Sequence, residues 1–323
     1  MPRRTLVISA MPRRTLVIAA LAVAGAVAIP SAGAHRLPKA PGCPVLPSSN
    51  AFNQRVDRLP VAANSQTLVS SIGLDARIHA DFGSGTYEGG PIGIPYAVVR
   101  KSQKRVPVSF EYAGESDRGH YPIPPNVPIE GGPNAGGDRH VLVVDRDRCR
   151  LYELYDAHPR DGGTSWTAGS GAIFDLRSNR LRPAGWTSAD AAGLPILPGL
   201  ARYHEVAEGS IDHALRFTAR RTRRAYVRPA RHFASDSGDP ALPPMGTRVR
   251  LKANVDLAGL GRQARIVARA LKRYGALLAD NGSPWYFSGA PDRRWDDDDL
   301  HTLDRLSGTD FEVVDTRSLP RPR

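Results

Sequence analysis

The chain has 323 residues, a formal net charge of +12 at pH 7 and only two cysteines. After the first 34 residues, no run approaches the roughly 18 apolar residues that a membrane span needs. This pattern excludes a bundle of membrane helices, and we expect a soluble mature protein.

The N-terminus is typical of an exported protein. Its first two blocks of ten residues differ at one position, which favours a duplicated or misassigned start, with Met11 as the true start. From Met11, two arginines, an apolar stretch at 16–29 and Ala32-Gly33-Ala34 form a secretory signal pattern. We therefore predict a signal peptide over residues 1–34 and an extracellular, secreted protein.

The Pro-rich segment 35–50 has no regular periodicity and predicts an N-terminal arm. In an oxidising compartment, Cys43 and Cys149 most simply form one disulfide. This bond would close a loop of roughly a hundred residues, which stabilises a fold by about 4–5 kcal/mol in the chain-entropy account. The disulfide is predicted to hold this arm against a later hairpin.

Loss of the signal's four arginines lowers the formal net charge from +12 to +8. The densest remaining patch is Arg216–Arg231, which favours an anionic cell-envelope glycan as partner over nucleic acid, because the protein is predicted to be exported. A solvated, arginine-rich face without a specific partner is the favoured interpretation of this patch. We predict a monomer and no nucleic-acid partner.

Most elements predicted from residue 51 onward are strands, although a short helix comes first, at Ala63–Gly73. Short runs rich in Val, Tyr, Phe and Thr then alternate with Gly and Pro, which is typical of an antiparallel sandwich or jelly roll. These runs are 96–99, 105–112, 140–145, 150–156, 171–176, 211–218, 224–230, 248–253, 284–289 and 311–315. We predict one mainly β domain over 51–323, with two or three short helices.

Two of those helices come late in the chain. Apolar residues at helical spacing between Leu260 and Tyr274 predict one helix, which Gly275 ends. A second apolar stripe starts at Leu300, directly after four acids. Asp296–Asp299 could bind calcium, but acids in a first helical turn also suit the helix dipole, and capping is the favoured interpretation.

Three short motifs suggest ordinary structural roles. "HEVAE", His204–Glu208, lacks the second His of a zinc-protease helix, and the Gly209 that follows favours a strand end. Thr187–Asp190 has the spacing of a helix cap. Asn281-Gly282-Ser283 matches a glycosylation acceptor, but Asp280-Asn281-Gly282 is also typical of a turn.

Cleavage after Ala34 would make His35 the N-terminal residue. Its amine and imidazole could then hold copper, and it resembles the N-terminal histidine of lytic polysaccharide monooxygenases. The following residues, "RLPKAPG", are linker-like and do not supply a rigid strand for such a site. We therefore predict no cofactor, with copper at His35 and calcium at Asp296–Asp299 as the less favoured alternatives.

Polar residues inside predicted strands are the main candidates for chemistry. His213 lies on the apolar face of 211–218, where a hydrogen-bonded core histidine is the favoured alternative. In the hairpin 137–157, a four-residue loop at Asp145–Arg148 would place His140 directly opposite Glu153. Glu153 has apolar neighbours, which predicts either a paired cation or a raised pKa suited to a general acid.

The units Gly-x-Ile-x-His-Ala-Leu (Gly209–Leu215) and Arg-Tyr-Gly followed by Asp (Arg273–Asp280) resemble a group of uncharacterised secreted bacterial β-rich proteins. The resemblance covers about 138–315. It implies a secreted β-rich protein and carries no activity.

These observations predict a secreted glycoside hydrolase or polysaccharide lyase, with a non-catalytic glycan-binding or cell-envelope module as the alternative. The predicted catalytic residues are Glu153, His140, His213 and Asp280. The predicted sugar-stacking aromatics are Trp166, Trp186, Trp285 and Tyr286.

Overall fold

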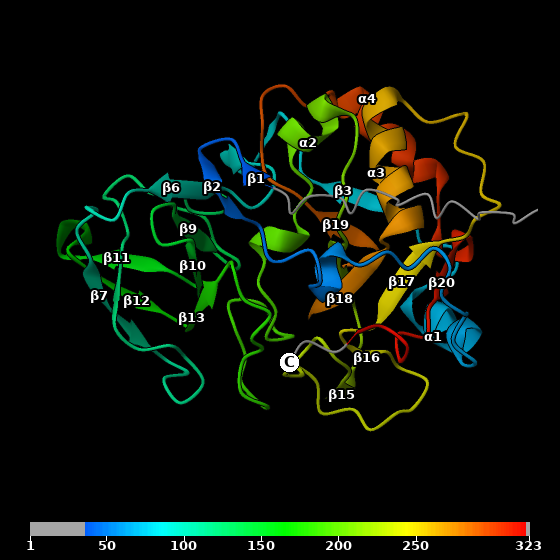
Figure 1. The fold of residues 1–323 in the computed structure, drawn as a ribbon, viewed down its shortest axis with the longest axis horizontal. Coiled ribbons are helices and arrows are strands. Elements are labelled where there is room, and N and C mark those ends of the chain that lie inside the picture. Colours follow the sequence, from blue (N-terminus) through cyan, green and yellow to red (C-terminus); the bar gives the residue numbers. More distant parts are fainter. Residues whose placement is uncertain (1–35, 321–323) are drawn as a thin grey trace, which may run out of the picture. The chain divides into compact units, whose positions relative to one another are not determined.

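Residues 36–320 are described by the computed structural model (Figure 1). The predicted signal peptide and the candidate copper ligand His35 lie outside these residues. The mainly β, sandwich-like architecture is confirmed, and three larger sheets dominate the described chain. None of the helices described over 36–320 combines the length and apolar character that a membrane crossing requires.

The central four-stranded sheet has the order β13–β10–β9–β6. Its strands are β6 (Tyr96–Val99), β9 (Val141–Asp145), β10 (Arg150–Tyr155) and β13 (Ser170–Asp175). The outer four-stranded sheet has the order β11–β12–β7–β8. Its strands are β7 (Val106–Phe110), β8 (His120–Tyr121), β11 (His158–Arg160) and β12 (Ser165–Ala168).

The six-stranded sheet has the order β20–β17–β18–β14–β19–β3. Its strands are β3 (His79–Asp81), β14 (Leu215–Ala219), β17 (Arg248–Leu251), β18 (Ala276–Asn281), β19 (Tyr286–Ser288) and β20 (Phe311–Val313). Each of the ten predicted runs overlaps a strand, but several strands lie outside the runs, including β12 and β18. Several neighbours run parallel, including β14 with β18, so the sheets are mixed.

Smaller elements connect these sheets. Three two-stranded ribbons are β1–β2 (Arg36–Leu37 and Ala40–Pro44), β4–β5 (Thr86–Tyr87 and Gly90–Pro91) and β15–β16 (Arg223–Tyr226 and Pro244–Met245). The α-helices are α1 (Ser65–Ile72), α2 (Tyr203–Glu208), α3 (Arg262–Arg273) and α4 (Asp297–His301). Short 3-10 segments are 51–53, 161–163, 197–199, 302–305 and 308–310.

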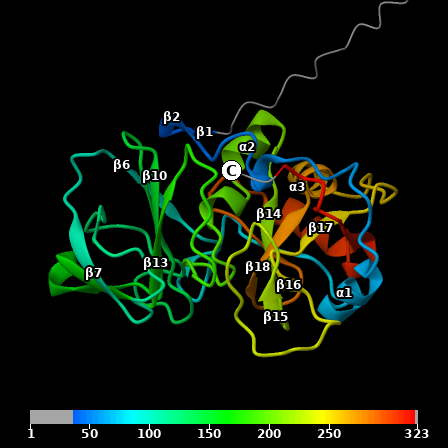
Figure 2. The ribbon, with the colours of Figure 1, turned by 60° about the horizontal axis from the view of Figure 1, so that its bottom comes forward.

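Alternation of side chains along β9 and β10 gives the central sheet two apolar faces. Val143 and Tyr152 belong to a core shared with the outer sheet, whereas Leu142 and Leu151 belong to the main core, which includes Phe217 of β14. Figures 1 and 2 show the central sheet between the other two. The central sheet therefore has no broad face left for solvent, and a site must lie at a strand end or an edge.

The predicted disulfide is present. Cys43 and Cys149 are bonded, with their Cα atoms 5.3 Å apart. Leu37, Val45 and Leu46 of the arm are buried in the main core, so the arm packs as part of the fold.

The three predicted helices are present as α1, α3 and α4, and α2 is an additional helix. Gly275 has φ +63° directly after the end of α3, and a Cβ there would lie 2.0 Å from the Val249 carbonyl oxygen. The strand end predicted at "HEVAE" is wrong, because these residues form most of α2, which Gly209 ends with φ 100°. Glu205 points into the core there and pairs with Arg202, so burial of an ion pair favours the helix.

Candidate active site

A cavity of about 420 Å³ opens beside the last residue of β10, the first residue of β13 and the end of β18. Its polar lining includes Glu115, Asp138, Tyr155, Ser170, His232 and Asp280. Asp280 belongs to the predicted catalytic set, whereas the other five do not. Among the cavities of the described chain, this one is lined by the most carboxyl groups, those of Glu115, Asp138 and Asp280.

Asp280 is positioned by an irregularity in the six-stranded sheet. In the parallel pair β14–β18, Phe217 is opposite Leu278 but Thr218 is opposite Asp280, so Ala279 is an extra residue. The carbonyl oxygen of Ala279 accepts a hydrogen bond of 2.9 Å from the Ala192 amide. Because a bulge changes the direction of the following side chain, this local shift aims Asp280 at the cavity.

Burial raises the pKa of Asp280 to about 7, and the charges of Asp190 and Asp138 act in the same direction. Arg216 opposes this rise, as does the Asn281 amide, which donates to Asp280 Oδ1 at 2.7 Å. The Asp280 carboxyl is half-buried and keeps access to the cavity. A carboxyl with this pKa holds a transferable proton near neutral pH.

Arg216 and Asp190 form a buried ion pair whose charges act on Asp280. Both are buried, and the guanidinium donates from Nε and Nη2 to the two Asp190 carboxylate oxygens at 3.1 and 2.9 Å. Arg216 Nη1 donates to Ser288 Oγ. Arg216 is therefore not part of the predicted surface patch. The helix cap predicted at Thr187–Asp190 is wrong, because no helix begins there and the Asp190 carboxylate binds Arg216 instead.

Asp138 is an exposed carboxylate that also lines the cavity. Its loop is fixed by the next residue, Arg139, whose buried guanidinium donates to the carbonyls of Pro133, Ala135 and Ala157. Asp138 raises the pKa values of both Asp280 and Tyr155, so its charge is felt at both groups. The cavity thus combines a protonated carboxyl with an exposed carboxylate.

His140 is buried, and both of its ring nitrogens are hydrogen-bonded. Nδ1 is 2.6 Å from Glu130 Oε2, and Nε2 is 2.9 Å from the Ala189 carbonyl oxygen. Burial acts to lower the pKa of His140, but the Glu130 carboxylate outweighs it and raises this pKa to about 9. A protonated ring that donates to two acceptors supports the surrounding loops and has no free nitrogen for a substrate.

The predicted face-to-face pair of His140 and Glu153 does not form. The register pairs Leu142 with Glu153, because Asp145 is the last paired residue of β9 and its carboxylate accepts the amides of Asp147 and Arg148, which starts the turn one residue later than predicted. His140 instead packs near Tyr155, with ring centroids 6.0 Å apart. The two predicted residues share a face, but His140 lies two residues before Leu142, the residue opposite Glu153.

Glu153 is fully buried and has a structural environment. Its carboxylate accepts hydrogen bonds of 2.9–3.0 Å from the Ile196 and Leu197 amides. Burial raises the pKa of Glu153 to about 7, and those two amides oppose the rise. Glu153 lines none of the cavities described here, so the predicted raised pKa is present without access to a substrate.

His213 also lies in the interior. It precedes β14 and is 2.8 Å from Arg202 Nη2 and 3.2 Å from Glu205 Oε1, within a buried ionic cluster. The strand predicted from residue 211 begins only at Leu215. The structure therefore brings Asp280 to the cavity and leaves His140, Glu153 and His213 in the protein interior.

The four predicted aromatics do not gather at the cavity. Trp166 and Trp285 are core residues, and Trp285 stacks on Phe217 with centroids 5.5 Å apart. Tyr286 stacks against His79 instead. Trp186 is half-buried, and the Arg182 guanidinium lies over its ring.

Two tyrosines that the sequence reasoning missed line the cavity. Tyr112 is 51% exposed, and Tyr155 is half-buried. Tyr112 ends the predicted run 105–112, and a polar-tipped aromatic at a strand end was the available signal. Asp138, two residues before His140, had no comparable signal, because it lies in a Gly-rich loop.

Two of the four consecutive aspartates, Asp296 and Asp299, hold helix ends. Asp296 accepts the Asp299 amide at the start of α4, and the Asp299 carboxylate accepts the Gln263 and Ala264 amides at the start of α3. Asp297 accepts the amide and hydroxyl of Ser84. Within residues 36–320, no group of three or more His, Cys, Asp or Glu side chains has an arrangement suited to a metal ion.

No family model, no curated protein and no solved structure matches this chain. The chemistry must therefore be argued from the cavity itself. It offers a proton donor near neutral pH in Asp280, a second carboxylate in Asp138, and tyrosine rings in contact with solvent. A proton donor together with a second carboxylate is suited to acid–base cleavage of a carbon–oxygen bond.

Proposed function

We propose that the protein is a secreted glycoside hydrolase that uses Asp280 as general acid and Asp138 as the second carboxylate. The observation that carries this proposal is the half-buried Asp280 carboxyl, with its pKa raised to about 7, in one cavity with the exposed Asp138. Glycosidases require two such carboxyls in different protonation states.

In this mechanism Asp280 donates its proton to the glycosidic oxygen as the bond to the anomeric carbon breaks. Asp138 either attacks that carbon or removes a proton from the attacking water. A retaining enzyme has its carboxyls about 5–5.5 Å apart and an inverting enzyme about 6.5–9.5 Å. The configuration of the sugar anomer that is released first, measured by NMR, shows whether Asp138 acts as the nucleophile or as the base that activates water.

A neutral or amino-bearing glycan fits the cavity better than a polyuronate. Its lining contains three carboxyl groups, those of Glu115, Asp138 and Asp280, and neither lysine nor arginine. A lyase must stabilise a uronate carboxylate as negative charge develops beside it, which calls for a cation close to the substrate. The hydrolase is therefore proposed in preference to the lyase.

An exposed aromatic ring at the cavity and the disulfide also support the proposal. Tyr112 offers an exposed ring on which a sugar can stack. The Cys43–Cys149 disulfide is the kind of bond that persists in an oxidising compartment, where secreted glycan-active proteins work.

The test is a panel of neutral, amino-bearing and uronate polysaccharides, with new reducing ends and ultraviolet absorbance of unsaturated products read in parallel. Wild type is expected to produce reducing ends without unsaturated products. Asp280→Asn and Asp138→Asn should lose this activity, and the control Glu153→Gln should keep it.

Two results would overturn the proposal. Retention on insoluble glycan with no cleavage would identify a binding module, which is the alternative that the sequence leaves open. Unsaturated products would identify a lyase.

A further inference from the structure

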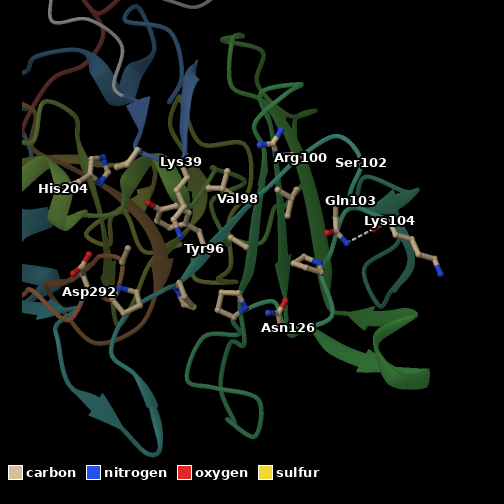
Figure 3. A pocket seen from close by; sticks show the side chains of 18 of the residues that line it. Lys39, Tyr96, Val98, Arg100, Ser102, Gln103, Lys104, Asn126, His204 and Asp292 are labelled. Atoms are coloured by element: carbon tan, nitrogen blue, oxygen red, sulfur yellow. Dashed lines mark hydrogen bonds between the residues drawn. The ribbon is translucent and has the colours of Figure 1, made fainter.

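A second concave region lies apart from the candidate active site and shares none of its lining residues. It is a groove of about 930 Å³ that follows β6 and its flanks, from Pro95 to Arg100. Figure 3 shows Tyr96 and Val98 near its centre, with His204 and Asp292 on one side and Gln103 and Lys104 on the other.

The groove lies along the outer edge of β6. All six residues from Pro95 to Arg100 line it, although the side chains of Val98 and Ala97 pack against different cores on opposite faces of the sheet. A surface that contacts consecutive residues with opposite side-chain directions must run along the strand edge.

The two edges of this sheet differ in what covers them. At β13, the Gly171 amide donates to Ser116 Oγ at 3.2 Å, the Ile173 amide donates to Asp117 Oδ2 at 2.9 Å, and the Asp117 amide donates to the Gly171 carbonyl at 3.0 Å. Among residues 36–320, β6 pairs with β9 only, and no second strand or covering segment bonds to its outer side. Alternate amides and carbonyls of β6 are therefore available to another strand.

The rim of the groove is basic. Lys39, Arg100 and Lys104 are exposed, and none of the three forms an ion pair with the described residues. The only carboxylate that lines the groove, Asp292, is already held by the Arg294 guanidinium at 2.6 and 2.8 Å. An occupant with negative side chains would meet uncompensated positive charge.

We propose that β6 is a docking edge for an extended acidic polypeptide, which adds to the central sheet as a fifth strand. The backbone carries the recognition, because outward amides and carbonyls alternate with the two-residue period that only another β-strand matches. The basic rim selects acidic side chains on the incoming segment. This inference does not depend on the proposed hydrolase activity.

The probe is a fluorescent eight-residue peptide of alternating Glu and Val, with blocked ends, measured by anisotropy against the intact protein. Two further versions carry N-methyl groups on either the odd or the even residues, so that each loses the donors of one edge. We expect one N-methylated version to bind like the parent and the other to bind at least tenfold more weakly. A Lys-Val peptide should bind at least tenfold more weakly than the Glu-Val parent.

The protein side is tested with Arg100→Glu combined with Lys104→Glu, and with Arg221→Glu as an exposed control outside the groove. The double variant should weaken binding about tenfold or more, whereas the control should not change it. Equal binding of both N-methylated versions would overturn strand addition. Absence of peptide binding would also overturn it, as would binding of polygalacturonate in place of the peptide.

Discussion

Glu153 and Asp280 are two strand carboxyls that differ in access to solvent. Burial raises the pKa of each to about 7. Glu153 is sealed and holds the backbone amides of Ile196 and Leu197, whereas Asp280 reaches a cavity that also contains Asp138. A raised pKa by itself therefore does not identify a catalytic group, because a substrate must also be able to reach the proton.

The variant Asp280→Asn tests most directly whether access to solvent makes Asp280 the catalytic carboxyl. We expect glycan cleavage to fall by about a thousandfold or more, because the proton donor is lost. The free energy of unfolding at pH 8 should rise at the same time, because the half-buried charge is removed. Cleavage assays and denaturant unfolding at pH 8 measure both, and a variant that stays active would refute the assignment.

Glu153→Ala should have the opposite outcome. Two buried amides lose their acceptor and a cavity remains, so unfolding should become easier by about 3–5 kcal/mol. Glu153→Gln is the matched control, because its amide oxygen can still accept from both backbone amides. Denaturant unfolding measures the loss, and cleavage by Glu153→Gln within a few fold of wild type would support a structural role.

The pH dependence of stability should follow from three groups whose pKa values are raised in the folded protein. Asp280 and Glu153 have folded pKa values of about 7, against ordinary values of 3.8 and 4.5, so the unfolded chain releases these protons first and stability falls as pH rises from about 4 through 7. His140, at about 9 against 6.5, stabilises fully below 6.5 and loses that contribution as pH rises through 9. Unfolding at pH 5, 7 and 9 should show a steady decrease, and higher stability at pH 9 than at pH 5 would contradict these assignments.

The smallest expected effect is at the cavity mouth. Tyr112→Ala should raise KM about fivefold with little change in kcat, because an aromatic contact of about 1 kcal/mol is lost. Tyr87→Ala is the control, since Tyr87 is 70% exposed and lines none of the described cavities. Equal changes in the two variants would mean that Tyr112 does not contact the substrate.

Patterns between near neighbours in the chain predicted much of the fold. The strand runs, the end of α3 at Gly275 and the capping by Asp296 follow from periodicity and local hydrogen bonding. The missed strand β18 shows the limit of this approach. Its sequence "ALLADN" lacks β-branched residues, and its place in the sheet depends on pairing with β14, which lies about 60 residues earlier.

The candidate site was predictable only in part, because access depends on segments that are remote in sequence. Asp280 was singled out, but its cavity exists because the Asp138 loop and the segment around Asp190 meet β18. Glu153 is a reasonable candidate from the sequence, but its carboxylate is bound by the amides of Ile196 and Leu197, which lie more than 40 residues away in the chain.

Residue types and short-range spacing were enough to predict the disulfide partners, the mainly β composition and the approximate positions of ten strands, because each depends on residue type or on spacing within one element. Tertiary structure decided which acids water can reach, how β9 and β10 align, and which sheet edge stays open. These features depend on contacts between distant segments, and a shift of one residue in the turn after Asp145 was enough to separate His140 from Glu153.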